Sequence, residues 1–284
     1  MRVSLAGALT VATVLAGAPA AIANTTKSTN WAGYAVHRAG ITFRYISGTW
    51  TQPNATCVAG HPAYSAAWIG LGGYSPTSQA LEQIGTELDC NAAGKVSSSA
   101  WYELVPAGST TVSLPVSPGD VMHATVTVTG HQVAVNLENL TRHEDFHKVL
   151  YASSIDVGSA EWIVEAPSNC VSSVDCQALP LANFGTVNFE SASAAATTGR
   201  PGTIVDRRWG RTKIKLTAGA QGVVAATTMD VAGSAVPSRL RGDGTAFDVT
   251  YATAAVKPSP GFTPRRPHLS SGYLRHYLTR AEFG

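Results

Sequence analysis

Apolar and polar side chains alternate along much of residues 30–255, in short runs separated by Gly, Pro, Ser and Asn. In residues 121–129, the even-numbered positions are Met, Ala, Val and Val, whereas the odd-numbered positions are Val, His and three Thr. Successive side chains of a strand point to opposite faces, so this run predicts a strand whose even-numbered face packs on a core. Gly130-His131 then predicts a tight turn into a second strand at 132–138.

The same pattern predicts further strands at 42–51, 66–71, 100–105, 160–165 and 247–251. Turn-forming residues recur at short intervals, and hardly any stretch has the 3.6-residue period of a helix. The 284 residues are enough for one large β domain or two smaller ones. We therefore predict an all-β fold, an antiparallel β-sandwich.

The two ends of the chain differ from this body. Arg2 precedes an apolar run at 3–18, and Ala21-Ile22-Ala23 offers the small residues of a cleavage site before Asn24. This indicates a secretory signal at 1–23, because the run is too short and too interrupted for a membrane anchor. Residues 24–255 are the expected domain, and 256–284 form a basic, Pro-rich tail expected to lie outside the fold. We expect a secreted, extracellular protein.

Charge narrows the range of partners. Charged residues make up 13% of the chain, about half of the usual share of roughly 25%. Five positive side chains lie in the tail: Lys257, Arg265, Arg266, Arg275 and Arg280. The remaining body is mildly acidic, without a basic face that could hold nucleic acid by its phosphates.

The chain contains four cysteines: Cys57, Cys90, Cys170 and Cys176. An even number in an exported protein favours disulfides over catalysis, and three pairings are possible. The pairing with the shortest closures is Cys57–Cys90 with Cys170–Cys176. The absence of a CxxC pair disfavours a zinc ribbon.

One short motif suggests metal chemistry. Residues 143–147 read His-Glu-Asp-Phe-His, an HExxH string that on a helix would place two imidazoles toward a zinc ion. A third ligand would have to be Glu161 or Glu165, both in a strand-like segment. We therefore interpret 142–147 as a hairpin tip and keep a zinc peptidase as a minor alternative.

Four segments combine tryptophan with amides or carboxylates in apolar strands. They are Asn30-Trp31-Ala32-Gly33-Tyr34, Trp68-Ile69-Gly70-Leu71-Gly72-Gly73 leading to Leu81-Glu82-Gln83-Ile84-Gly85, Ala100-Trp101-Tyr102-Glu103, and Ala160-Glu161-Trp162-Ile163-Val164-Glu165. In the last segment, Glu161, Ile163 and Glu165 share one face. Spacing alone favours an exposed face with two solvated acids. A groove with a desolvated carboxylate is the alternative.

In this order, the segments resemble the eqolisins, the pepstatin-insensitive glutamic peptidases. The similarity continues at 137–141 and, more weakly, at 179–184 and 247–251. It implies a sandwich of two long curved sheets, concanavalin- or jelly-roll-like, with an active site on the concave face. It also implies peptide or protein substrates, a monomer, and neither cofactor nor metal.

The resemblance further implies residue roles. Gln83 and Glu165 match the catalytic pair, whereas Trp31, Trp68 and Glu103 match residues that line the site. Glu165 would activate water as a general base, and the Gln83 amide would donate to the oxyanion. Because a lone glutamate has an ordinary pKa of about 4.3, we expect activity at acidic pH.

Two positions depart from the family pattern, since Gly72 and Ala166 stand where relatives usually carry Asp. Neither replacement removes a member of the catalytic pair, but the first could alter hydrogen bonding near it. A non-catalytic β-sandwich that binds carbohydrate or peptide is the main alternative function, because fold alone does not separate the two.

Overall fold

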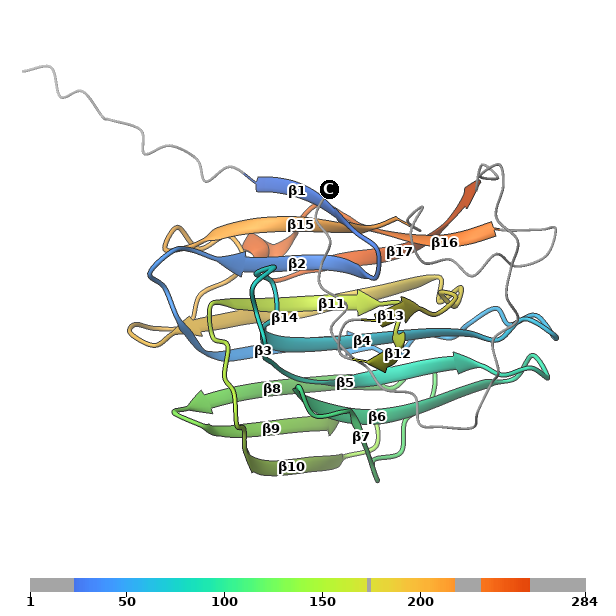
Figure 1. Ribbon diagram of the computed structural model, residues 1–284, viewed down its shortest axis with the longest axis horizontal. Coiled ribbons are helices and arrows are strands. Elements are labelled where there is room, and N and C mark those ends of the chain that lie inside the picture. Colours follow the sequence, from blue (N-terminus) through green and yellow to red (C-terminus); the bar gives the residue numbers. More distant parts are fainter. Residues whose placement is uncertain (1–22, 173–174, 218–230, 256–284) are drawn as a thin grey trace, which may run out of the picture.

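Backbone hydrogen bonds join nearly all strands into a single sheet that folds over on itself (Figure 1). The computed structural model describes residues 23–172, 175–217 and 231–255. The strands are β1 Ala23–Ser28, β2 Trp31–His37, β3 Phe43–Thr51, β4 Ala63–Gly72, β5 Leu81–Cys90, β6 Val96–Val105, β7 Thr110–Val112, β8 Val121–Thr129, β9 Gln132–Asn139, β10 Glu144–Tyr151, β11 Ser159–Glu165, β12 Ser168–Ser172, β13 Asp175–Ala178, β14 Thr186–Ala196, β15 Gly210–Leu216, β16 Val231–Pro237 and β17 Phe247–Ala255. A short 3-10 helix, Gly242–Gly244, precedes β17.

The strand order is β10-β9-β8-β3-β14-β17-β16-β15-β2-β11-β4-β5-β6-β7, with β1 beside β15. All neighbours on this path pair antiparallel, whereas β1 and β15 are parallel. The two halves of the path stack, so that β3 and β8 lie against β4 and β5. The prediction of an all-β antiparallel sandwich is confirmed.

The main core fills the space between these two layers. Trp162 of β11 is fully buried there, and its indole N–H donates to the Ser47 carbonyl of β3 at 2.8 Å. Trp50 of β3 reaches the Thr86 hydroxyl of β5 at 2.9 Å in the same way. These cross-layer hydrogen bonds satisfy the indoles in an apolar interior, where an unpaired donor is costly.

The hairpin predicted at 121–138 forms as expected. β8 spans Val121–Thr129, and its even-numbered residues are buried while the others are partly or fully exposed. Gly130 has φ +59°, a conformation that a turn requires and glycine adopts readily. The pairing of Thr129 with Gln132 closes the turn.

The Cys57–Cys90 disulfide forms, with a Cα–Cα distance of 5.3 Å. It ties the segment after β3 to the end of β5. In the β12–β13 hairpin, the backbone of Cys170 lies opposite that of Cys176, although their side chains lie outside the described part of the structure. The second disulfide therefore stays a prediction.

The HExxH string does not lie on a helix. Residues 140–143 form the turn after β9, with His143 at φ +58°, and the exposed β10 begins at Glu144. The predicted hairpin tip at 142–147 is thus too long. The geometry required by the zinc alternative is absent, because Glu144 and His147 are strand residues and the described residues contain no cluster that could hold a metal.

The predicted signal peptide at 1–23 lies outside the described residues except for Ala23, which begins β1. The predicted tail at 256–284 also lies outside them. No helix among the described residues is long and apolar enough to cross a membrane.

Candidate active site

A second apolar cluster covers the face of β15, β2, β11, β4, β5 and β6 that points away from the main core; we call this surface the site face. It contains Trp31, Ala35, Ala66, Trp68, Leu81, Trp101, Val105, Ile163 and Ile214. Strand alternation and antiparallel register bring these residues together, because paired residues of neighbouring strands point to the same side. Glu161, Glu165, Gln83 and Glu103 lie among them.

Glu165 ends β11, where its register partners are Trp31 on β2 and Ala66 on β4. Its side chain is only 3% exposed. The Trp68 indole N–H donates to one carboxylate oxygen at 2.8 Å, and the Asn30 amide donates to the other at 3.2 Å. Two N–H donors favour the ionised form of a carboxylate, which a buried acid otherwise avoids.

The two tryptophans predicted to line the site are in contact. Trp31 and Trp68 meet edge to face, with ring centroids 5.0 Å apart. Gly85 makes the position of Trp68 possible, because a Cβ at Gly85 would lie 2.5 Å from the Cβ of Trp68. The aromatic pair therefore forms an apolar wall beside the Glu165 carboxylate.

Asn30 is a site residue that the sequence pattern did not single out, although it belongs to the first tryptophan segment. The Ser28 hydroxyl donates to the Asn30 side-chain oxygen at 3.0 Å, and the Ala166 backbone N–H donates to the Asn30 carbonyl at 2.8 Å. These contacts orient the amide so that its N–H faces Glu165. The sequence shows an amide directly before Trp31, but the spacing of residues does not predict which side chain this amide bonds.

Gln83 and Glu103 form the second part of the site. They are register partners on β5 and β6 and are 2% and 0% exposed. The Gln83 amide donates to Glu103 Oε2 at 2.7 Å. Trp68 lies between the two parts of the site on β4. Ala66, two residues before it, pairs with Glu165, and Gly70, two residues after it, pairs with Gln83.

Burial raises the pKa of Glu103 well above its ordinary value, and the nearby charge of Glu165 raises it further. The hydrogen bond from Gln83 opposes this shift without cancelling it. Glu103 is therefore a neutral acid over the acidic range. The two carboxyl groups are thus close enough for the charge of Glu165 to affect the pKa of Glu103.

A second group of acids lies beside this site. Glu161 and Glu82 are both fully buried, and burial raises the pKa of Glu161 well above the ordinary range and that of Glu82 to about 9. No N–H group of the described residues bonds the Glu161 carboxyl, and the Ser159 side chain beside it lowers its pKa by less than burial raises it. The expectation of an exposed strand face with solvated acids is wrong, because both Glu161 and Glu165 are desolvated.

The structure gives a physical context for Gly72, one of the departures from the family pattern. Gly72 has φ +88°, and a Cβ there would lie 2.4 Å from the Asp156 carbonyl oxygen. The Asp156 carboxylate accepts the Gly73 N–H at 3.3 Å and a short hydrogen bond from the Ser78 hydroxyl. Asp156, from the β10–β11 loop, thus fills the space that a side chain at residue 72 would need, and its carboxylate holds the loop that follows.

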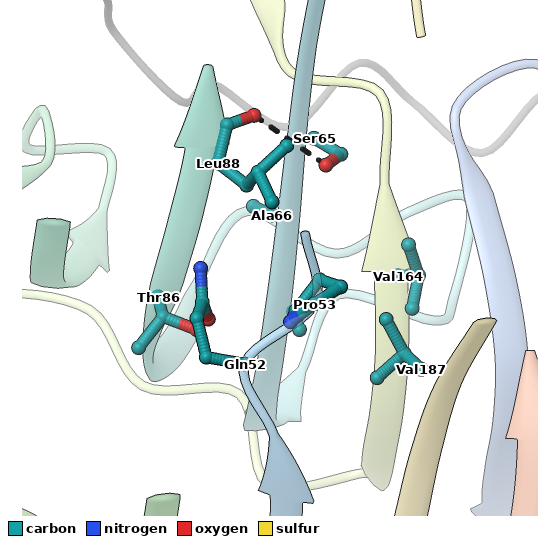
Figure 2. A pocket seen from close by; sticks show the side chains of 9 residues that line it. Gln52, Pro53, Ser65, Ala66, Thr86, Leu88, Val164 and Val187 are labelled. Carbon is teal, nitrogen blue, oxygen red and sulfur yellow. Dashed lines mark hydrogen bonds between the residues drawn. The ribbon is translucent and has the colours of Figure 1, made fainter. Parts of the chain in front are cut away.

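The pocket in Figure 2 is separate from these acids. It lies behind the site face, between the end of β3 and strands β4, β5 and β11, where Gln52 and Pro53 face Val164 and Val187. The Ser65 hydroxyl donates to the Leu88 carbonyl at its rim. Its lining contains no carboxylate, so it lacks the chemistry of the Glu165 site.

An all-β sandwich that holds a hydrogen-bonded carboxylate near a buried amide has the groups a water-activating hydrolase needs. A sequence model of the peptidase A4 family matches residues 29–236, so the chain belongs to that family, the eqolisins. The resemblance read from the sequence is confirmed. No curated protein sequence matches the chain significantly.

Solved structures agree with this assignment. Scytalido-glutamic peptidase with a transition state analog inhibitor is 26% identical, with a TM-score of 0.62, and the alignment covers 79% of this chain and 98% of that one. SCP-B, an eqolisin in complex with the tripeptide Ala-Ile-His, is 25% identical with a TM-score of 0.57 over 79% and 98% of the two chains. The chain is therefore a glutamic peptidase homologue that spans these relatives almost completely.

Proposed function

We propose that the protein is a secreted acid endopeptidase in which Glu165 activates water and Gln83 stabilises the oxyanion. The observation that carries this proposal is the Glu165 carboxylate, held by Asn30 and Trp68 on the sheet face that also holds the Gln83–Glu103 pair. Membership of the peptidase A4 family supports peptide bonds as the substrate.

In the proposed reaction, ionised Glu165 takes a proton from a water molecule that lies between it and the scissile carbonyl. The resulting hydroxide attacks the carbonyl carbon, and the C=O bond becomes a C–O⁻ single bond. Protonated Glu165 then gives its proton to the leaving nitrogen as the C–N bond breaks. Trp31 and Trp68 exclude other water and hold the peptide chain by apolar contact.

Neutral Glu103 can prepare Gln83 for this step. The Gln83 side-chain oxygen has no hydrogen-bond partner among the described residues. A half turn of the amide lets the protonated Glu103 carboxyl donate to that oxygen, which leaves both amide N–H groups for the substrate. The amide then donates to the developing oxyanion, a contribution of roughly 3–4 kcal/mol to the barrier.

The same two groups set the pH range of the proposed activity. Glu103 must keep its proton to act as a donor, whereas Glu165 must lose its proton to act as a base. Since burial raises the pKa of Glu103, we expect a pH window in which the first is neutral and the second ionised.

The test is hydrolysis of casein and of a quenched peptide from about pH 2 to about pH 8 by full-length protein and by Glu165→Gln, with pepstatin and EDTA as controls. We expect acid-peaked activity that resists both inhibitors and is lost in the variant. Silence of correctly folded protein at every pH would favour a peptide- or carbohydrate-binding module. Loss of activity in EDTA would contradict the metal-free mechanism.

A further inference from the structure

Five cations lie together on β15 and the segments beside it. Arg211, Lys213 and Lys215 occupy alternate positions of β15, so their partly exposed side chains point to the same side of the strand. Lys27 of β1 is exposed and is the register partner of Lys215. Arg239, in the segment after β16, is also exposed. We call these five residues the basic strip; β1 and β15 lie along the top of Figure 1.

The positive charges of the basic strip are close to one another and are not paired with acids. Burial lowers the pKa of Lys213, and the neighbouring charges of Lys215 and Arg239 lower it further, so these three cations share one environment. The salt bridges among the described residues use other cations, namely Arg142, Arg208 and Arg241. The basic strip therefore keeps its full positive charge at the surface.

The rest of the chain offers little to neutralise the basic strip. The residues outside the described ranges include two acids, Asp230 and Glu282, and Glu282 belongs to a tail that carries five cations. Cleavage at the predicted signal site would add an α-ammonium group at Asn24, which pairs with Thr212 of β15. Like charges held together destabilise the folded state. An anion from outside the chain would relieve this repulsion.

The basic strip and the site face lie on opposite sides of β15. Ile214 belongs to the site-face cluster, whereas Lys213 points to the side of its β2 partner Tyr34, a residue of the main core. Among the described residues, β16 pairs with β15 only at Leu216 and Ala235, which leaves the strip side of β15 partly open to solvent. A ligand bound at the basic strip therefore leaves the site face accessible.

The arrangement of the basic strip favours a linear ligand. Side chains two residues apart on a strand are separated by about 6.8 Å, so the row from Arg211 to Lys215 spans about 14 Å. A chain of anions can follow such a row and contact every cation. Bases of a single-stranded nucleic acid would also need aromatic rings to stack on. The exposed aromatic ring among the described residues, that of Tyr151, lies on β10 at the far end of the strand order.

The proposed acidic activity narrows the chemistry of the anion. Carboxyl groups have an ordinary pKa near 4 and lose much of their charge in that range. Phosphate and sulfate esters keep a negative charge there, and arginine and lysine form charge-assisted hydrogen bonds to such oxyanions. A polymer of these esters would therefore stay bound under conditions in which a polycarboxylate is released.

We propose that the basic strip binds a linear polymer of phosphate or sulfate esters and so retains the secreted protein on a polyanionic matrix, with its site face free. This binding goes beyond the proposed peptidase function and does not depend on it. Only the preference for strongly acidic esters over carboxylates rests on the proposed acidic range.

The test measures binding of full-length Glu165→Gln protein, in which self-hydrolysis is prevented, to fluorescently labelled polyphosphate and dextran sulfate at about pH 4. A flexible polyanion releases about 0.7 counterion for each charge that is neutralised, so the basic strip predicts a slope of log K against log salt of about −3.5. Affinity should then fall roughly a hundredfold between about 50 and about 200 mM salt. The polymer that binds more tightly identifies the ester.

Two matched variants locate the binding site. Lys213→Gln with Lys215→Gln removes two cations of the basic strip, so the slope should change to about −2.1 and the affinity at about 50 mM salt should fall at least about tenfold. Arg265→Gln with Arg266→Gln removes the same charge from the tail and should leave both values unchanged. Far-ultraviolet circular dichroism checks that both variants are folded. Equal losses in the two variants, or a loss confined to the tail variant, would overturn the assignment to the basic strip.

Other anions test the class of ligand. Labelled polygalacturonate should bind more weakly than either ester polymer at about pH 4, and equal binding would contradict the preference for strong acids. Vesicles of phosphatidylglycerol and phosphatidylcholine distinguish a membrane from a polymer. Strip-dependent binding to these vesicles without binding to the polymers would overturn the proposal in favour of a lipid surface. Tighter binding of single-stranded DNA than of polyphosphate would overturn it in favour of a nucleic acid.

The accessibility of the site face is measured in protein with Glu165 intact. Saturating polyphosphate should leave KM for a short uncharged peptide unchanged, because the polymer lies on the other side of β15. A large rise in KM would show that the polymer covers the site face and would overturn the proposed arrangement. Absence of any hydrolysis would instead refute the proposed peptidase function and leave the binding result standing.

Discussion

Glu161 and Glu165 lie four residues apart on the same face of β11, yet their surroundings differ. Both are almost completely buried. Glu165 receives N–H groups from Asn30 and Trp68, whereas Glu161 receives no N–H group in the described part of the chain and has only the Ser159 side chain to support a charge. Burial alone therefore does not make a base. Directed donors decide which buried acid can carry a negative charge.

The largest expected effect comes from replacing Glu165, the proposed base of the two glutamates. Glu165→Gln should lower kcat/KM by about 10²- to 10⁴-fold, because it removes the proposed general base while keeping the shape of the side chain. Glu161→Gln is the matched control on the same strand face and should retain activity within a few-fold. Steady-state hydrolysis of a quenched peptide at acidic pH measures both. The reverse ranking would assign the base to Glu161.

A smaller loss is expected at the oxyanion donor. Gln83→Leu keeps most of the side-chain volume but removes both N–H donors, so kcat should fall by about 10²- to 10³-fold. KM should change much less, because the lost interaction forms mainly in the transition state. A rise in KM with unchanged kcat would mean that Gln83 only binds the substrate.

The donors around Glu165 should have a more modest effect. Asn30→Ala removes one N–H from the carboxylate, and a hydrogen bond to a charged group contributes about 1.5 kcal/mol or more, so activity should fall about tenfold. The acid limb of the pH–rate profile should move to higher pH, since the ionised form loses support. Asn188→Ala, at an exposed amide that bonds Asp248 at 2.6 Å, is the control and should leave the profile unchanged.

The smallest expected effect concerns the pH dependence of the free energy of unfolding, to which Glu161 and two other buried acids contribute. Burial raises the folded-state pKa of Glu82 to about 9 and those of Glu103 and Glu161 well above their ordinary values. These three groups then bind more protons in the folded chain than in the unfolded one, so the stability that they contribute is full below about pH 4 and declines as pH rises toward about 9.

Urea unfolding at several pH values measures that decline, and Glu161→Gln should reduce it because the amide cannot ionise. Glu190→Gln, on exposed β14 sequence, serves as a surface control. Equal pH dependence in Glu161→Gln and the parent would show that Glu161 is not the source.

The local alternation of apolar and polar residues was enough to predict much of the fold. The bounds of β8 match the predicted run residue for residue, because strand alternation is a short-range signal. The HExxH string was harder to place, since five residues do not distinguish a helix from a turn followed by edge strand β10. A hairpin tip could be predicted there, in place of a zinc-binding helix, only because the preceding residues have the pattern of a strand.

The environment of the site was less accessible to sequence reasoning. Whether the acids of β11 are exposed depends on β2 and β4 beside them and on what covers the sheet, so alternation predicted their common face but not their burial. The Asn30–Glu165 contact joins residues 135 positions apart. Likewise, no residue near Gly72 in the sequence predicts its contact with Asp156, which lies in a loop more than 80 residues away.

Isotope-edited infrared difference spectroscopy tests the central claim most directly, because protonated and ionised carboxyl groups absorb at different frequencies. Spectra of Glu165→Gln and Glu161→Gln are each subtracted from that of the parent at the pH of maximal activity. We predict that the first difference shows the loss of an ionised carboxylate and the second the loss of a buried protonated carboxyl. The opposite assignment would contradict Glu165 as the base.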